Sequence, residues 1–462
     1  MSDRAFIGHP RGLAYLAFTE MWERFSYYGM GALLVLYMVQ ELLLPGHIEN
    51  VWGMAAVRGG LEGMFGPLSA QALASLLFGL YGGLVYFTPV IGGWLADRYF
   101  GARRMVLAGI LLMTGGHFAM TFEESFLIAL VLLIIGSGAL KGNIATQVGQ
   151  LYPRNEEARR SRGYAIFSTF INVGAFGGPI ISGALAQAYG WHVGFAFAGV
   201  LMLFAIAVFV AGRKHLPIDR PNRHQHERRA PLTPSERRTL ILMLPVLGAA
   251  VLAHISYFQS FNTGFVWISD HVNLSTQFGD VPVPWFGSID PLAGIAVMPL
   301  LLLWWRAQAK RGREPSDIGK IAIGLLLMAA GMVMFAVGGL FAGTGQTCII
   351  WPLLGYCCTG IGFLWYWPVT LAFVSRRAPG SITSLTIGST YVTLFVASLL
   401  TGYIGSLYQT LPAAQFFLLN AALPASGAVL LFLFGRHLTR TLDAASDEHT
   451  KHPLISSQES TT

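Results

Sequence analysis

The sequence predicts an all-α membrane protein with twelve transmembrane helices in two six-helix halves and both termini in the cytoplasm. Three observations lead to this fold class. Of the 462 residues, 54% are hydrophobic and only 11% are charged, with a mean hydropathy of +0.55, whereas soluble domains carry roughly 25% charged residues. The chain divides into twelve apolar runs. Its basic residues gather on one side of these runs.

The apolar runs have the length that a transmembrane helix needs, which is about 20 residues. They cover residues 13–44, 70–96, 104–121, 126–150, 164–188, 192–212, 239–269, 287–305, 318–342, 346–374, 381–407 and 413–435. The start of the chain has no cleavage site of small residues after a short apolar segment, so we expect the first helix to be retained.

The positive net charge of +7 reflects orientation in a membrane rather than nucleic-acid binding. With both termini inside, Arg24 and Lys141 fall within apolar runs, and Arg58 is the one basic residue on the outer side. The others lie on the cytoplasmic side, as the positive-inside rule requires. We therefore expect a multi-pass protein of the cell inner membrane, in contact with the lipid bilayer and without a nucleic-acid partner.

A polar stretch rich in Arg, His and Pro divides six runs from six. The loops Asp97–Arg104 and Arg306–Lys320 each follow the second run of a half, which indicates the weak internal repeat of a 6+6 transporter. The predicted division is an N-terminal half at 1–212, a cytoplasmic linker at 213–238, a C-terminal half at 239–437 and a disordered cytoplasmic tail at 438–462.

Ionisable side chains inside the runs are informative, because they are costly in lipid and normally face a bundle interior or a water-filled cavity. Glu20, Glu23 and Arg24 stand at spacings that place Glu20 on one helix face with both others. Lys141 lies midway along its run, where we expect it to need an anionic partner. These groups form either a switchable site or a static salt bridge. Asp290, at the start of the eighth run, is either a functional carboxylate or a helix cap.

The segment EMWERFSYYG in the first run resembles the ExxERFxYYG signature of the proton-coupled oligopeptide transporter (POT) family of the major facilitator superfamily. GGWLADRYFGARR, LKGNIATQVGQLY, FSTFINVGAFGGP and KRGREPSDIGK extend the resemblance over almost the whole chain. It implies a central cavity, alternating access by rocking of two halves, and proton-driven uptake of di- and tripeptides.

The resemblance also implies roles for the residues that match the family motifs. Its proton-coupling cluster falls on Glu20, Glu23, Arg24 and Lys141, with Arg24 and Lys141 also facing the peptide carboxylate, and its pocket falls on Tyr27, Tyr28, Tyr81 and Asn172.

The rest of the pocket departs from the family pattern. Gly31 and Gln259 replace both members of a family salt bridge, and Phe363 replaces the glutamate that anchors the peptide amino group. Thr390 stands for a family tryptophan and Asp290 for an asparagine. We expect Gln259, Phe363, Thr390 and Asp290 at substrate-binding positions, with Asp290 also coupling protons. An excess carboxylate in the cavity takes up a proton more readily near the working pH. Asp290 is the proton site, an ammonium anchor or a helix cap.

The predicted function is proton-coupled symport of di- and tripeptides with a non-standard pocket. A second hypothesis keeps the fold and the coupling but changes the cargo to another small carboxylate-bearing solute or a modified peptide. A peptide-sensing membrane receptor is a remote third. Because no HExxH or GxSxG motif occurs, we do not expect an enzyme. We expect no cofactor and no metal site, a proton as the coupling ion, a small peptide as the substrate, and a monomer.

Overall fold

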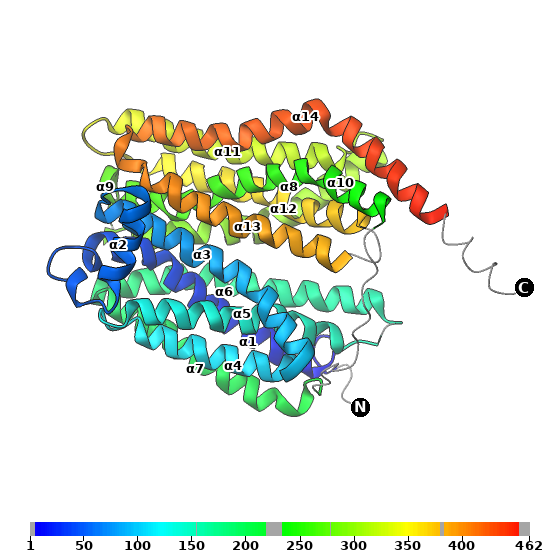
Figure 1. Ribbon diagram of the computed structural model, residues 1–462, viewed down its shortest axis with the longest axis horizontal. Helices are drawn as coiled ribbons and strands as arrows, with labels where there is room; N and C mark the ends of the chain where they lie inside the picture. The colour runs from blue at the N-terminus through cyan, green and yellow to red at the C-terminus, as the bar shows by residue number, and fades with distance from the viewer. Residues whose placement is uncertain (1–4, 154, 219–232, 278, 379–382, 452–462) are drawn as a thin grey trace, which may run out of the picture.

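The computed structural model describes residues 5–153, 155–218, 233–277, 279–378 and 383–451, and these are almost entirely helical (Figure 1). The first half contains α1 (Arg11–Tyr37), α2 (Met54–Phe65), α3 (Ala70–Leu95), α4 (Ala102–Ala119), α5 (Phe126–Gln150), α6 (Glu157–Tyr189) and α7 (Trp191–Gly212). Short π or 3-10 turns lie between or extend them: η1 (Met38–Leu42), η2 (Ile48–Asn50), η3 (Ala96–Phe100) and η4 (Arg213–His215).

The second half contains α8 (Pro234–Phe261), α9 (Thr263–His271), η5 (Val283–Ser288), α10 (Ile289–Lys310), α11 (Asp317–Ala342), α12 (Ile350–Arg377), α13 (Thr383–Ser406), η7 (Tyr408–Thr410) and α14 (Ala413–Lys451). Two minimal sheets accompany it, with β1 (Val272–Asn273) parallel to β4 (Thr347–Cys348) and β2 (Ser275–Thr276) antiparallel to β3 (Gly279–Asp280).

Hydroxyl caps define where several of the helices begin. The Ser69 hydroxyl accepts a hydrogen bond from the backbone N–H of Ala72 at the start of α3. At α8 the exchange is reciprocal, because Thr233 accepts from the backbone of Glu236 and the Glu236 carboxylate accepts from the backbone of Thr233. Such a capping box satisfies two backbone donors that the first turn leaves unpaired.

Within the described residues, ten helical segments are long and apolar enough to cross a membrane. The two other long helices that run with them in the bundle are α1 and α4 (Figure 1). Charged and polar residues lower the apolar character of both: Glu20, Glu23 and Arg24 in α1, and the Arg103–Arg104 pair in α4. The all-α expectation is therefore confirmed, with ten segments meeting the criterion for a span.

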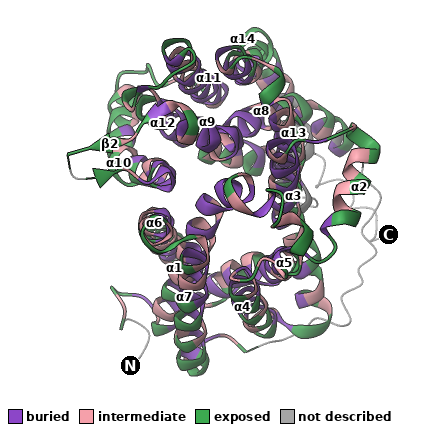
Figure 2. Cartoon of the chain, turned by 90° about the vertical axis from the view of Figure 1, so that its left-hand side faces the viewer, coloured by how far each residue is buried: buried purple, intermediate pink, exposed green. Residues whose placement is uncertain are grey.

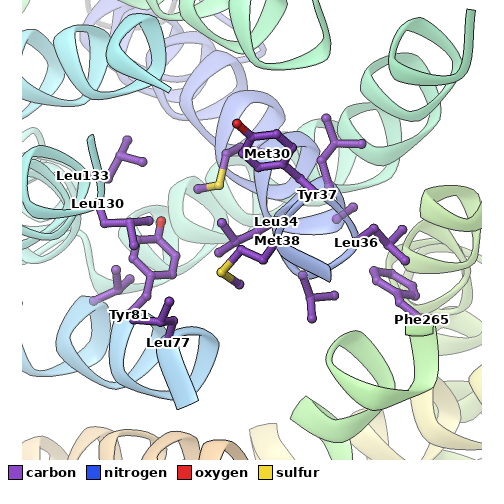
Figure 3. Packing of buried hydrophobic residues seen from close by; sticks show 14 of the residues in the cluster. Met30, Leu34, Leu36, Tyr37, Met38, Leu77, Tyr81, Leu130, Leu133 and Phe265 are labelled. Atoms are coloured by element: carbon purple, nitrogen blue, oxygen red, sulfur yellow. The ribbon is translucent and has the colours of Figure 1, made fainter. Parts of the chain in front are cut away.

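Seen end-on, α8 to α14 gather above and α1, α4, α5, α6 and α7 below, with α3 beside α13 (Figure 2). Buried residues lie mainly on the helix faces turned toward other helices, and exposed residues lie mainly on the outer faces. In the core, Met30, Leu34 and Met38 of the first helix and its extension lie among leucines of α3 and α5 (Figure 3). This apolar packing places the first helix against α3 and α5.

The two halves approach each other most closely along α3 and α13. A Cβ atom added to Gly79 would lie 2.6 Å from both the Cα of Gly402 and the carbonyl oxygen of Ser398. Only glycine fits at that separation, since real Cβ atoms do not come so close to backbone. Nearby, the Gln71 amide donates to the Gly405 carbonyl at 3.0 Å, and the Ser75 hydroxyl donates to Asn262 at 3.1 Å. These contacts join the halves at the end of the bundle that carries α2.

One segment differs from its sequence expectation. The residues from 438 onward are predicted as a disordered tail, but α14 continues as a helix to Lys451. The prediction is therefore wrong for 438–451, where helix α14 extends beyond its apolar part, while 452–462 lie outside the described residues. Much of the predicted 213–238 linker, namely 219–232, also lies outside them.

Candidate functional site

Three ionisable side chains of α1 form a compact buried cluster. Glu20, Glu23 and Arg24 are 4%, 0% and 7% exposed. The Arg24 Nε atom lies 2.9 Å from a Glu20 carboxylate oxygen and 2.6 Å from a Glu23 carboxylate oxygen. Because one guanidinium lies against two carboxylates, the cluster holds one more negative than positive charge when all three are ionised. Such a cluster is stable in a buried site only while a further cation or a proton is close.

Lys141 brings the second cation from α5. Its Nζ atom lies 4.1 Å from the centre of the Tyr27 ring and 5.3 Å from that of Tyr86. Among the described residues, no carboxylate lies within salt-bridge distance of it. Glu20 and Glu23 are near enough to Lys141 to interact with it electrostatically, but its direct contacts are two aromatic faces, whose negative quadrupoles attract an ammonium. All three ammonium donors stay available to an incoming anion.

Tyr27 links the two cations of this wall. Its ring lies under Lys141 and also 5.3 Å from the Arg24 guanidinium carbon. The Tyr27 and Tyr28 rings meet edge to face, with centres 5.3 Å apart. Of the two adjacent tyrosines in the first-helix motif, Tyr27 therefore lies against the Arg24 and Lys141 side chains, and Tyr28 packs against the Tyr27 ring.

The facing wall is built by α8 and α10. The Tyr257 hydroxyl on α8 donates a hydrogen bond to the Asp290 carboxylate at 2.6 Å. Ser288, not Asp290, precedes α10 as its N-cap residue, and its hydroxyl donates to the Phe176 carbonyl of α6. The described bond of Asp290 thus goes to a side chain of the neighbouring helix. This geometry argues against the helix-cap interpretation.

A cavity lined by residues of both halves lies beside these charged groups, which are not themselves among its lining residues. Tyr27, Tyr28, Tyr81, Tyr86 and Tyr257 line it, together with apolar side chains and Gly31. Tyr28 is near enough to both Arg24 and Asp290 to interact electrostatically with each. A Cβ atom on Gly31 would meet no atom within 4 Å. The replacement of the family arginine at this position therefore leaves open space.

The remaining predicted site residues lie in different surroundings. Gln259 is fully buried, donates to the Thr401 carbonyl at 3.2 Å and accepts from Asn262. These bonds hold it at the junction of α8 and α9, and its role as a substrate contact stays a prediction. A carboxylate-to-amide change suits this position, because the amide nitrogen meets a carbonyl oxygen that would repel a carboxylate.

Phe363, Thr390 and Asn172 complete the set. Phe363 of α12 stacks on Tyr257 with ring centres 4.9 Å apart and extends the aromatic wall. Thr390 of α13 is 1% exposed. Asn172 of α6 is half-buried and has no hydrogen bond to another described residue, so its amide remains available. The structure brings Phe363 to the Asp290 side of the site and buries Thr390.

Comparison with known proteins identifies the family. The model of the Major Facilitator Superfamily matches residues 16–402. The chain belongs to the major facilitator superfamily. The uncharacterized transporter YclF of Bacillus subtilis is 29% identical over 474 residues, covering 90% of this chain and 91% of the relative. The di-/tripeptide transporter of Lactococcus lactis subsp. cremoris is 27% identical over 508 residues, covering 96% and 98%.

A solved structure agrees with these sequence relatives. The crystal structure of peptide transporter POT in complex with sulfate matches this major facilitator protein with a TM-score of 0.82 and 27% identity, covering 95% of this chain and 97% of that one. The resemblance to the POT family is confirmed. The prediction that the chain is not an enzyme is also confirmed, since the relatives of this major facilitator protein are transporters.

Two residues of the site were not found by sequence reasoning. Tyr86 supplies the second ring beside Lys141, and Tyr257 holds Asp290. Both are tyrosines in apolar runs, and that pattern is also typical of tyrosines at a membrane interface. Their partners come from other helices, so no spacing within one helix indicates them.

Proposed function

We propose that this chain is a proton-coupled symporter that imports di- and tripeptides across the cell inner membrane by alternating access. The proposal includes twelve transmembrane helices, with α1 and α4 completing the ten apolar segments, cytoplasmic termini and action as a monomer. The observation that carries it is the contrast between two cations: Arg24 is engaged by two carboxylates, while Lys141 contacts aromatic rings and has no ion pair with a carboxylate among the described residues. The similarity to a di-/tripeptide transporter supports the cargo.

A peptide carboxylate fits the N-terminal wall because Lys141 retains its hydrogen-bond donors. An anion next to the Tyr27 face would gain a charge-assisted hydrogen bond from the ammonium without first breaking an ion pair. Arg24 can join only when Glu20 or Glu23 releases it. Protonation of one of these carboxylates provides that release, and this couples proton binding to substrate binding.

The charges of the site favour the binding of one proton in each transport cycle. Glu20, Glu23 and Asp290 oppose Arg24 and Lys141, which leaves a net charge of minus one when all are ionised. A zwitterionic peptide does not change that sum, so one proton makes the loaded site neutral. When the transporter closes around its substrate, the site is shielded from water. A neutral loaded site makes this closed state lower in free energy, because a charge away from water is unfavourable.

Asp290 gives the second wall two available roles. It can take the proton, or it can pair with the substrate ammonium in place of the family glutamate that Phe363 replaces. The second hypothesis, another small carboxylate-bearing solute or a modified peptide, rests on the same observation, because aromatic rings surround the position of the missing anchor. Both cargoes share the carboxylate that Lys141 would bind.

Uptake into liposomes with an imposed proton gradient tests the function directly. We expect accumulation of labelled dialanine that an uncoupler abolishes. Accumulation of another carboxylate solute, with no competition by dialanine, would instead support the second hypothesis. Binding of dialanine with neither accumulation nor counterflow would leave the receptor hypothesis and contradict the symporter.

The chain offers a matched control for the lysine. Lys320 also lies over an aromatic ring, with its Nζ atom 4.3 Å from the Trp305 centre, but it pairs with Glu314 away from the cavity. Lys141→Ala should abolish uptake, whereas Lys320→Ala should retain it. Equal loss in both variants would mean that removing a buried lysine damages the fold, and that the assignment of Lys141 fails.

A further inference from the structure

A cluster of histidines and carboxylates lies at the α2 end of the N-terminal half, away from the cavity. Glu41 comes from η1, Glu123 from the α4–α5 loop and His192 from the start of α7. One ligand atom of each lies within 4.8 Å of the others. The His192 Nε2 atom is 3.2 Å from a Glu41 carboxylate oxygen, and His47 Nδ1 lies 2.7 Å from Glu123. Three separate segments therefore bring one donor atom each together, and His47 lies next to this group through its contact with Glu123.

A buried hydroxyl beside the cluster supports a ligand there. Tyr37 is 0% exposed, and its hydroxyl has no hydrogen-bond partner among the described residues. Tyr37 precedes Glu41 by four residues, so both lie on the same helix face. Its ring meets the His192 ring edge to face, with centres 5.6 Å apart, and Glu41 and Glu123 are near enough to act on it electrostatically. An unsatisfied buried hydroxyl lowers the stability of the fold, and a hydrogen bond to a ligand in the cluster would remove that penalty.

The chemistry of the donors points to a transition-metal cation. Two carboxylates close together repel each other unless a positive charge lies between them. Imidazole nitrogen and carboxylate oxygen are ligands that Zn²⁺ accepts in a tetrahedral shell, with bonds of about 2.0–2.2 Å. Ligand atoms of such a shell lie roughly 3.3 Å apart, so metal binding would draw the donor atoms closer together by side-chain rotation. The ligand side chains are 18–44% exposed, which leaves the site open to solution.

We infer that Glu41, Glu123 and His192, with His47 as the fourth ligand, form a binding site for Zn²⁺ on this face. The sequence gives no sign of this site, because the four ligands are too far apart in the chain for any spacing motif. A bound Zn²⁺ would link the end of α1 to α7 and to the α4–α5 loop. The neighbouring Gln40 donates to Ser269 of the other half at 2.6 Å, so the metal would also fix a segment that joins the halves.

Zinc binding by the untagged full-length protein in detergent tests the site. Titration calorimetry should give one Zn²⁺ per chain. The midpoint temperature of thermal unfolding should rise with Zn²⁺ and return to its original value with EDTA, because a ligand that binds the folded state stabilises it. Mg²⁺ and Ca²⁺, which prefer all-oxygen shells, should give no shift. Co²⁺ should give the visible absorption bands of a tetrahedral site. No binding at 100-fold excess Zn²⁺, or a purely octahedral Co²⁺ spectrum, would overturn the inference.

Variants locate the metal on these residues. His192→Gln and Glu41→Gln should lower the affinity at least tenfold, and the exposed His47→Gln should lower it less. His271→Gln is the matched control, a histidine at the same end of the molecule in the other half, and it should bind as wild type. Unchanged stoichiometry and affinity in all three cluster variants would place the zinc elsewhere and contradict the site. Should His192→Gln not fold, the Co²⁺ spectrum of the wild-type protein and the His47→Gln affinity still decide.

Discussion

Two charged groups contact the tyrosines that line the cavity, one as its N-terminal wall and one as its C-terminal wall, and they differ in how they hold charge. The N-terminal wall carries Glu20, Glu23, Arg24 and Lys141, with both signs present and an arginine shared between two carboxylates. The C-terminal wall carries one carboxylate, Asp290, held by a tyrosine hydroxyl in aromatic surroundings. The first wall can exchange partners as protons and anions arrive, whereas the second presents a single charge. We infer that the first wall binds the substrate carboxylate, that carboxylates of both walls take part in proton coupling, and that the second wall also sets which cargo fits.

The strongest test of this division removes a cation from the N-terminal wall. Arg24→Ala should abolish uptake and destabilise the protein by about 3–5 kcal/mol, because two buried carboxylates lose their partner. Lys141→Ala should abolish uptake with a smaller loss of stability, since no ion pair is broken. Liposome uptake and thermal unfolding measure the two effects. Near-normal uptake by both variants would contradict the role of the N-terminal wall in coupling and carboxylate binding.

A charge introduced at Gln259 separates a cavity position from a structural one. Gln259→Glu should destabilise the protein by about 3 kcal/mol, because a buried carboxylate would replace the amide that donates to the Thr401 carbonyl. Gln259→Met, which introduces no charge, should cost less. Thermal unfolding of both variants provides the comparison. Wild-type stability of Gln259→Glu would show that the position is open to water and belongs to the cavity after all.

Neutralising Asp290 tests the role of the C-terminal wall in coupling. Asp290→Asn keeps an acceptor for Tyr257 but removes the charge, so gradient-driven accumulation should fall at least tenfold while counterflow persists. Tyr257→Phe keeps the charge and should retain accumulation with an altered pH profile. Both variants are assayed by uptake and counterflow. If Asp290→Asn accumulates substrate like the wild type, the carboxylate takes no part in coupling.

The smallest expected effect concerns the N-terminal segment before α1. His9 is buried and hydrogen-bonded to Tyr152 at 2.8 Å. Burial, together with the positive charges of Arg159 and Arg162, lowers the pKa of His9 below its ordinary value of 6.5. As the pH falls, His9 is protonated at a higher pH when its segment is detached than when the segment is docked against Tyr152. Docking of this segment is therefore stable above pH 6.5 and weakens as the pH falls below that value.

Hydrogen exchange of residues 5–10 between pH 8 and pH 5 measures this docking. After correction for the intrinsic rate, protection should decrease severalfold toward pH 5 in the wild type. His9→Gln should show a flat profile over the same range. An equally flat profile in the wild-type protein would show that His9 does not make the docking of this segment depend on pH.

Sequence reasoning succeeded where the chemistry lies within one helix. The spacing of Glu20, Glu23 and Arg24 predicts their grouping, because neighbours on a helix face meet whatever the rest of the fold does. It failed where a partner comes from elsewhere. Lys141 lies against rings of α1 and α3, and Gln259 faces a carbonyl of α13. The helix to Lys451 was also missed, because a polar composition predicts disorder whether or not an adjoining helix continues into it.

Peptide analogues with one end blocked test the central claim, that the N-terminal wall binds the substrate carboxylate through Lys141. Thermal unfolding of the wild-type protein would be followed with dialanine, with its C-terminal amide and with its N-acetyl form. We predict stabilisation by dialanine, none by the amide in the same concentration range, and none by dialanine in Lys141→Ala. Stabilisation by the N-acetyl form reports separately on Asp290 as an ammonium anchor. Equal stabilisation by dialanine and its amide would contradict the account.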